Sequence, residues 1–217
     1  VWLTYVADRL FDVRSLENTV LFSLRHQFAK RYHQRLWYLW FMILAIDLLL
    51  ATQLTGSQLK NGFILLLFCL LYTASNQKLS KHFFPKEICV ALIYAGGIII
   101  FMPVTSPLGF FGLFALLCLL NCLIIGAGEK TIDAKMRLYS LASLVEARWL
   151  TPLALFGVGL AVWGGSELWF SLALSYGLLG LLHGLRNRIN IEAFRVLADA
   201  TLILGALCAL CFIEKIG

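Results

Sequence analysis

Long apolar runs recur along almost the whole chain, with short basic segments between them. Seven runs are complete, and they cover residues 36–55, 62–75, 88–103, 108–125, 150–163, 168–185 and 194–212. A strand crosses a bilayer only in a closed barrel, whereas a helix satisfies its own backbone hydrogen bonds. Runs that approach the ~20 residues needed to span a hydrocarbon core therefore predict an all-α, polytopic helical membrane bundle with seven complete spans. Residues 1–7 predict the end of one further, partial span, and we expect upstream residues because the chain begins with Val.

The composition agrees with a membrane protein and excludes an ordinary soluble domain. Hydrophobic residues make up 60% of the 217 residues and charged residues only 14%, whereas soluble domains carry about 25% charged residues. The six cysteines lie inside apolar runs, where they are expected as small core residues. We expect residues 1–217 to form one integral-membrane helical domain.

Basic residues are distributed unevenly between the two sides of the predicted topology. Of the 18 Lys and Arg residues, only Lys60 and Lys215 fall on one side, which leaves the other sixteen on the opposite side. The positive-inside rule makes the basic side cytoplasmic, and we expect a bacterial inner membrane. The net charge of +6 therefore indicates a polarised membrane surface. No nucleic-acid-binding motif accompanies it, so a nucleic-acid partner is not expected.

Two acidic pairs with identical spacing lie on the predicted cytoplasmic side. They are Asp8 with Asp12, and Glu129 with Asp133. Residues four apart share one helix face, where two carboxylates repel each other unless a cation lies between them. Hard oxygen ligands suit Mg²⁺. The pairs therefore predict two metal sites that face each other and hold a diphosphate.

With these motifs the chain resembles the UbiA-type intramembrane prenyltransferases over about residues 2–213. The two acidic pairs match the two acidic motifs of that family, and Tyr72 to Lys78 approximates its intervening YxxxK-like element with a longer spacing. The segments PKEICVALIYAGGI (85–98) and FRVLADATLI (194–203) are also similar to the family. The resemblance implies nine spans, of which the first and most of the second precede this chain.

Two positions depart from the family's pattern. Thr4 stands where the first motif usually has Asn, and Glu129 opens the second motif in place of Asp or Asn. Asn121, two helical turns before Glu129, is expected to supply a compensating oxygen.

The resemblance implies transfer of an isoprenyl group from a prenyl diphosphate to a lipid-embedded acceptor, with two Mg²⁺ ions. The four acidic residues of the pairs are the expected metal ligands. Lys78, Arg137 and Tyr72 are the expected catalytic residues, and Arg9 and Lys135 the expected diphosphate contacts. Cations stabilise the charge that develops on the departing pyrophosphate. Membrane lipids and other membrane subunits are further expected partners.

Two other functional classes fit the same sequence. A non-catalytic UbiA-like subunit of a larger membrane complex would explain the departures at Thr4 and Glu129. A secondary transporter would need ionisable groups at mid-membrane, for which Asp47 is the candidate. We expect Asp47 instead to form a buried hydrogen bond between helices. The basic and aromatic segment 25–35 predicts an amphipathic connector that binds anionic headgroups.

Overall fold

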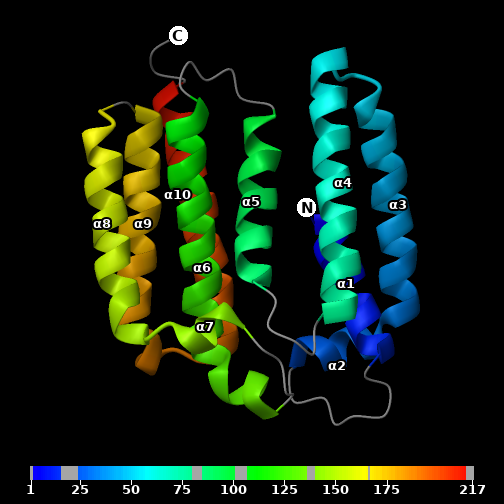
Figure 1. Ribbon diagram of the computed structural model, residues 1–217, viewed down its shortest axis with the longest axis horizontal. Coiled ribbons are helices and arrows are strands. Elements are labelled where there is room, and N and C mark those ends of the chain that lie inside the picture. The colour runs from blue at the N-terminus through cyan, green and yellow to red at the C-terminus, as the bar shows by residue number, and fades with distance from the viewer. Residues whose placement is uncertain are drawn as a thin grey trace. The chain divides into compact units, whose positions relative to one another are not determined.

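The computed structural model is built from helices (Figure 1). It describes residues 2–15, 24–79, 85–100, 107–135, 140–165 and 167–213, and no strand occurs within these ranges. The α-helices are α1 (Trp2–Ser15), α2 (Leu24–Arg31), α3 (His33–Ala51), α4 (Gly56–Leu79), α5 (Lys86–Ile99), α6 (Pro107–Lys135), α7 (Leu141–Leu144), α8 (Leu150–Trp163), α9 (Glu167–Gly184) and α10 (Ile191–Ile213). Two 3-10 turns, η1 (Ala147–Trp149) and η2 (Arg186–Arg188), precede α8 and α10.

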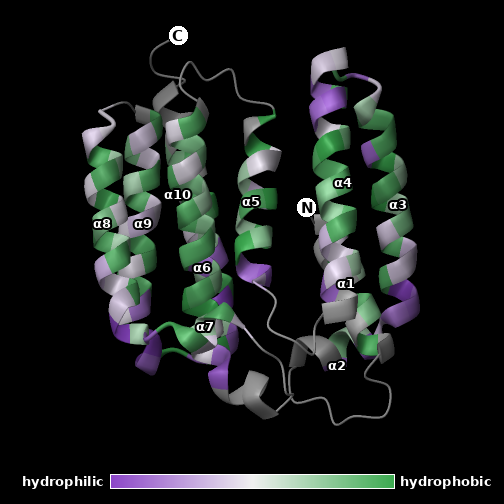
Figure 2. Cartoon of the chain, viewed as in Figure 1, coloured by the Kyte–Doolittle hydropathy of each residue, from purple (hydrophilic) through white to green (hydrophobic). Residues whose placement is uncertain are grey.

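The expected all-α class is confirmed, and each of the seven expected spans overlaps a helix, although residues 101–103 of the third lie outside the described residues. Three stretches are long and apolar enough to cross a membrane: His33–Ala51, Gly56–Asn76 and Leu108–Lys130. Two shorter apolar stretches, Ala147–Trp163 and Leu168–Gly184, accompany them. Figure 2 shows the hydrophobic residues along the middle of α6 and the hydrophilic ones toward its α7 end. These helices are compatible with an integral membrane protein, while the count of seven spans stays a prediction.

Several helix ends differ from the predicted spans, among them the ends of α3 and α6. The first expected span ran to residue 55, but α3 ends at Ala51, where the Thr52 N–H donates to the Leu49 carbonyl and the Gln53 N–H donates to the Leu50 carbonyl. The fourth was expected to end at residue 125, whereas α6 continues to Lys135. Its Gly126 and Gly128 do not stop the helix, since both positions approach other side chains closely. The second acidic pair is therefore part of the long helix itself.

The described helices group into two compact units. One unit holds α1 to α4, and the other holds α5 as far as Ala95, α6 as far as Thr131, and α7 to α10. The expectation of a single domain stays a prediction.

Small residues let α8, α9 and α10 pack closely within the second unit. A Cβ at Gly157 of α8 would overlap the ring of Tyr176 in α9. A Cβ at Gly205 of α10 would overlap the hydroxyl of Ser175 in α9. Helices in membranes gain stability from such close approach, because lipid is as apolar as their side chains.

Hydrogen bonds tie the same helices to one another and to α6. The Tyr176 hydroxyl, fully buried, donates to the Leu113 carbonyl of α6 at 2.7 Å. Ser175 Oγ donates to the Thr201 carbonyl of α10 at 3.1 Å. Buried polar groups need such partners. Together these contacts tie both α6 and α10 to α9, which positions the site described next.

Candidate functional site

Both acidic pairs lie on helices, where their four-residue spacing puts each pair on one face. Asp8 and Asp12 are four residues apart in α1, and Glu129 and Asp133 are four apart in α6. Glu129 is the one member of the four whose side chain belongs to the described part of the structure. The expectation that the two pairs face one cavity stays a prediction, because the other three side chains lie outside that description.

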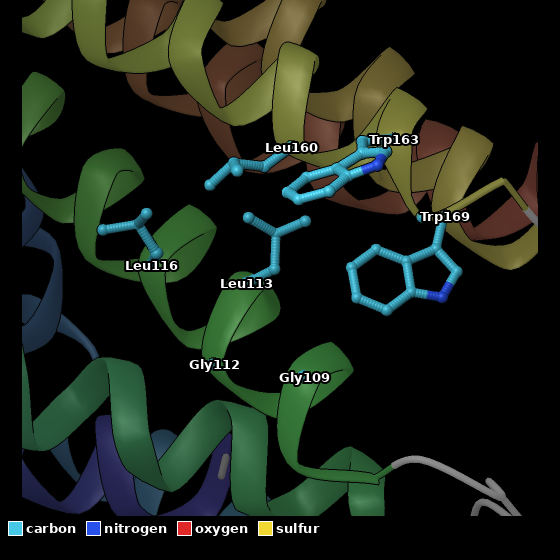
Figure 3. Close-up of a pocket in the computed structure, with 8 residues that line it drawn as sticks. Gly109, Gly112, Leu113, Leu116, Leu160, Trp163 and Trp169 are labelled. Atoms are coloured by element: carbon cyan, nitrogen blue, oxygen red, sulfur yellow. The ribbon is translucent and has the colours of Figure 1, made fainter.

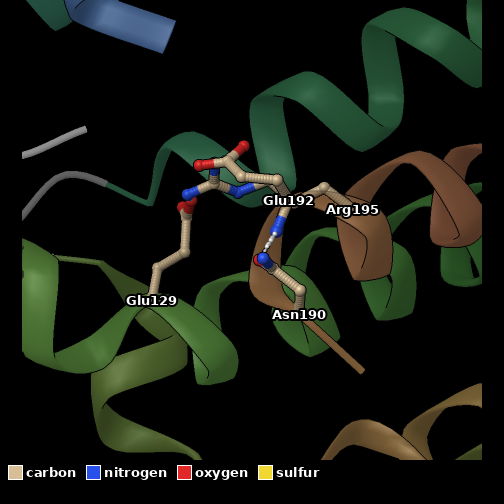
Figure 4. Close-up of polar contacts among 4 residues, drawn as sticks. All are labelled: Glu129, Asn190, Glu192 and Arg195. Atoms are coloured by element: carbon tan, nitrogen blue, oxygen red, sulfur yellow. Dashed lines mark hydrogen bonds and ion pairs between the residues drawn. The ribbon is translucent and has the colours of Figure 1, made fainter. Parts of the chain in front are cut away.

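Glu129 is buried at the end of α6 and forms an ion pair with Arg195 of α10. The two residues are 5% and 8% exposed, respectively. Arg195 Nη2 contacts Glu129 Oε1 (Figure 4). Charges removed from water are stable only when they are paired in this way. The second acidic motif thus has a cation supplied by the protein itself.

Glu192, one turn before Arg195, is the second carboxylate on this guanidinium. Arg195 Nη1 donates to Glu192 Oε2 at 2.7 Å. The start of α10 is fixed by Asn190, whose Oδ1 accepts the backbone N–H of Glu192 at 3.0 Å. Such a cap satisfies a backbone donor that the first helical turn leaves open. Figure 4 shows Arg195 between the two carboxylates, which leaves one net negative charge on the cluster of Glu129, Glu192 and Arg195.

A second polar contact joins α6 to α10 further along both helices. Asn121 Nδ2 donates to Asp199 Oδ1 at 3.0 Å. Asn121 is 5% exposed, and its Oδ1 has no hydrogen-bond partner among the described residues. The amide expected to support the metal site through its oxygen therefore uses its nitrogen on Asp199. Asp199 lies one turn after Arg195, so α10 presents both ionisable groups to α6.

The segment after α6 is held by two side chains of the second unit. Glu87 of α5 accepts the backbone N–H of Leu141 through Oε1 at 3.2 Å. Lys130 Nζ donates to the Val145 carbonyl at 3.1 Å. Glu87 is buried, and its Oε2 has no hydrogen-bond partner in the described part of the chain. These contacts place α7 beside the end of α6 that carries Glu129.

His183 connects α8 to the turn after α9. Its Nδ1 lies 2.8 Å from Thr151 Oγ1, and its Nε2 lies 2.8 Å from Arg186 Nη1. Because a guanidinium only donates, Nε2 accepts and Nδ1 carries the proton toward Thr151. The ring is thereby held in one neutral tautomer, and its role is to join helix ends.

An apolar cavity lies at the other end of α6, between the starts of α6 and α9 and the end of α8. Its volume is about 360 Å³. Figure 3 shows two indole rings beside a wall formed by glycines and leucines. The lining residues are Gly109, Gly112, Leu113, Leu116, Leu160, Trp163, Gly164 and Trp169. No charged residue is among these lining residues, which the structure describes.

The other expected site residues are placed only in part. Tyr72 is half-buried in α4, and Lys78 follows six residues later in the same helix. Arg9 lies in α1 and Lys135 ends α6, while their side chains and that of Lys78 are outside the described part. Arg137 lies outside the described residues altogether. Their predicted roles stay predictions.

Asp47 does not form the expected buried hydrogen bond. It is exposed on α3, a helix without any buried residue, and no hydrogen bond joins its carboxylate to another described side chain or backbone group. The expectation was wrong because it assumed that the apolar run of α3 is enclosed by other helices.

Both described carboxylates of the Glu129 cluster contact the Arg195 guanidinium, and metal binding there stays a prediction. Carboxylate oxygens are the ligands that Mg²⁺ prefers, and the cluster has one more carboxylate than guanidinium. Among the described residues no three His, Cys, Asp or Glu side chains form a group that could hold a metal. Asp133, one turn after Glu129, is the nearest predicted ligand in sequence.

Sequence reasoning missed Arg195, Glu192 and Asp199 as members of the site. The available signal was the spacing of three ionisable residues at positions 192, 195 and 199 of an otherwise apolar helix, since such residues in a membrane helix expect partners. Comparison with family models, with curated proteins and with solved structures gave no match.

Proposed function

We propose that this chain is an intramembrane prenyltransferase that resembles the UbiA type. It would move an isoprenyl group from a prenyl diphosphate to an acceptor dissolved in the lipid. The observation that best supports this proposal is the buried Glu129–Arg195 pair at the end of α6. This pair puts a carboxylate and a guanidinium one helical turn from Asp133. It lies at the end of an apolar helix that is long enough to cross a membrane.

The reaction breaks the allylic C–O bond, and the electron pair leaves with pyrophosphate. The acceptor forms the new carbon bond and loses a proton. Mg²⁺, when bound, supplies Lewis-acid stabilisation of the leaving group. Asp8, Asp12, Glu129 and Asp133 would hold it. The basic residues Arg9, Lys78, Lys135 and Arg137 would bind phosphate oxygens, and Tyr72 would help to orient the diphosphate.

Arg195 has a defined part in this proposal. A guanidinium bonds two oxygens at once and stays charged at any physiological pH. In the described arrangement its single positive charge is shared between Glu129 and Glu192. It would turn from Glu129 toward a phosphate oxygen when the diphosphate enters, which frees the Glu129 carboxylate for the metal.

A non-catalytic membrane subunit is the second candidate, and one observation favours it. Glu129 already has a cation in Arg195, so the pair is satisfied without any bound ion. In that case the pair would serve only to hold α6 and α10 together.

The test is prenyl transfer by the full chain in native membranes. Membranes that contain the protein would be incubated with radiolabelled geranyl or farnesyl diphosphate, with Mg²⁺ or with excess chelator. The enzyme proposal expects label in the lipid fraction that depends on the protein and disappears with chelator. Absence of label for the wild type, with lipid extracts and phenolic acceptors supplied, would favour the non-catalytic subunit.

A further inference from the structure

A pocket lies in the first unit between α1 and the start of α3, and we call it the α1–α3 pocket. Its volume is about 890 Å³. Its lining residues come from three consecutive parts of the chain: Leu10, Phe11 and Val13 of α1, Lys30 and Arg31 of α2, and Tyr32, His33, Gln34, Arg35 and Trp37 at the start of α3. The proposed transfer reaction assigns none of them a role.

One wall of the pocket is apolar and fixed. Leu10 and Val13 are buried against it. The rings of Phe11 and Trp37 meet edge to face with centroids 5.8 Å apart. Trp40, 5.6 Å from Trp37, donates its indole N–H to the Leu3 carbonyl at 2.8 Å. This hydrogen bond ties α3 to α1, so the wall exists before any ligand arrives.

The other wall is basic. Lys30, Arg31 and Arg35 are exposed and carry three positive charges. The guanidinium carbons of Arg31 and Arg35 lie 5.6 and 5.8 Å from the Tyr32 ring centroid, a cation–π arrangement that holds both side chains near one ring. No carboxylate is among the lining residues that the structure describes.

His33 adds a directed hydrogen-bond donor to the basic wall. The Trp37 indole N–H donates to His33 Nε2 at 3.2 Å, so Nε2 is the accepting nitrogen. The proton of the neutral ring is therefore on Nδ1. A ligand at this wall meets cations and a donor, which is the environment that a phosphate requires.

We propose that the α1–α3 pocket binds one anionic phospholipid, with its phosphate on the basic wall and an acyl chain along the apolar wall. The basic residues of the pocket favour a negatively charged headgroup. The apolar wall at Phe11 and Trp37 favours a ligand that also carries a hydrocarbon chain. The pocket opens at the first turn of α3, a helix apolar enough to cross a membrane. Figure 2 shows that the hydrophilic residues of α3 gather at this His33 end. Headgroups of anionic lipids are recognised at such helix ends by clustered basic residues.

A free phosphate could use only half of this pocket. It would meet Arg31, Arg35 and His33 and leave the apolar wall uncovered. The proposal therefore predicts that tight binding needs both an acyl chain and a negatively charged headgroup. Soluble phosphate and pyrophosphate, which lack the acyl chain, are tested separately.

The experiment is native mass spectrometry of the full chain, purified from nanodiscs of defined lipid. Phosphatidylglycerol and phosphatidylcholine with identical acyl chains would be offered in equal amounts. We expect one phosphatidylglycerol retained per chain and no retained phosphatidylcholine. The double variant R31Q/R35Q should bind phosphatidylglycerol on the order of 30-fold more weakly, because each basic residue near the headgroup strengthens binding several-fold.

The matched control is R148Q. Arg148 is an exposed arginine, 73% accessible, in the other unit and outside the pocket. It should leave lipid retention unchanged. Should R31Q/R35Q fold poorly by circular dichroism, R31K/R35K keeps the charge but loses the planar fork and should give an intermediate loss.

Three results would overturn the proposal. Equal retention of both lipids would show that the headgroup is not recognised. Equal effects of R31Q/R35Q and R148Q would show that recognition lies elsewhere. Release of the lipid by millimolar phosphate or pyrophosphate would show that the basic wall is a site for soluble anions. None of these results bears on prenyl transfer, which is measured separately.

Discussion

Arg195 of α10 pairs with Glu129 of α6, although 65 residues separate them in the chain and both lie in apolar helices. Through this contact, Arg195 places a positive charge beside Glu129, the first residue of the second acidic motif. In the proposed enzyme, Glu129 would be neutralised either by Arg195 or by a bound Mg²⁺ ion. The first three predictions depend on this pair and on the close helix packing beside it.

Breaking the buried pair should destabilise the bundle. R195Q leaves Glu129 buried without its cation, and we expect a loss of about 3–5 kcal/mol in the free energy of unfolding. R148Q is the matched control, because Arg148 contacts Glu146 at 2.5 Å on the surface and should change stability by at most about 1 kcal/mol. Unfolding in mixed detergent micelles measures both. Equal effects of the two variants would show that the Glu129–Arg195 pair is no stronger than a surface pair.

The same substitution should strengthen metal binding. Without Arg195, Glu129 has lost its competing cation, so R195Q should bind Mn²⁺ on the order of tenfold more tightly than the wild type. Pyrophosphate affinity should fall in the same variant, since a guanidinium that bonds phosphate oxygens is gone. Paramagnetic resonance of free Mn²⁺ and calorimetry give the two affinities. A purely structural role for Arg195 would lower both affinities together.

Gly157 and Gly159 of α8 offer a matched pair for the packing of the second unit. A Cβ at Gly157 would overlap the Tyr176 ring, whereas one at Gly159 would meet no atom within 4 Å. G157A should therefore cost about 1–3 kcal/mol of stability through overpacking. G159A should be neutral or stabilising by up to about 1 kcal/mol, because Ala favours a helix. Thermal unfolding followed by circular dichroism separates them, and similar melting temperatures would contradict the packing described.

The basic side of the protein should face the cytoplasm. Ser57 lies near Lys60 at the start of α4, and Ser143 lies in α7, close to the Glu129 end of α6; both are exposed. A membrane-impermeant maleimide should label S57C in intact cells and S143C only after the membrane is opened. Labelling of S143C in intact cells would reverse the predicted orientation.

The seven helices α3 to α6 and α8 to α10 could be predicted from the sequence because each contains a long apolar run. Their boundaries were less predictable, since Thr52 ends α3 inside the predicted run and the glycines at 126 and 128 do not end α6. Local pattern cannot show whether a glycine meets a neighbouring helix. Both acidic pairs lie on helices, α1 and α6, where residues four apart share a face.

The partners of the site residues could not be predicted. Which cation meets Glu129 depends on how α10 packs against α6, and Arg195 was grouped with the basic residues of the cytoplasmic side. The pairing of Asn121 with Asp199 could not be predicted for the same reason, because it also depends on how α10 packs against α6. Asp47 shows the converse error, since an ionisable residue in an apolar run was assumed to be enclosed and is exposed instead.

The most direct test of the central claim is the initial rate of Mg²⁺-dependent prenyl transfer in membranes containing the wild type, D8A, D133A or D47N. Each of the first two substitutions removes a proposed metal ligand and little core volume, so transfer should fall by at least about 100-fold at unchanged protein level. D47N replaces an exposed acid outside the proposed site and should keep the rate within about twofold. Transfer that persists in D8A and D133A, or that continues in excess chelator, would contradict the account.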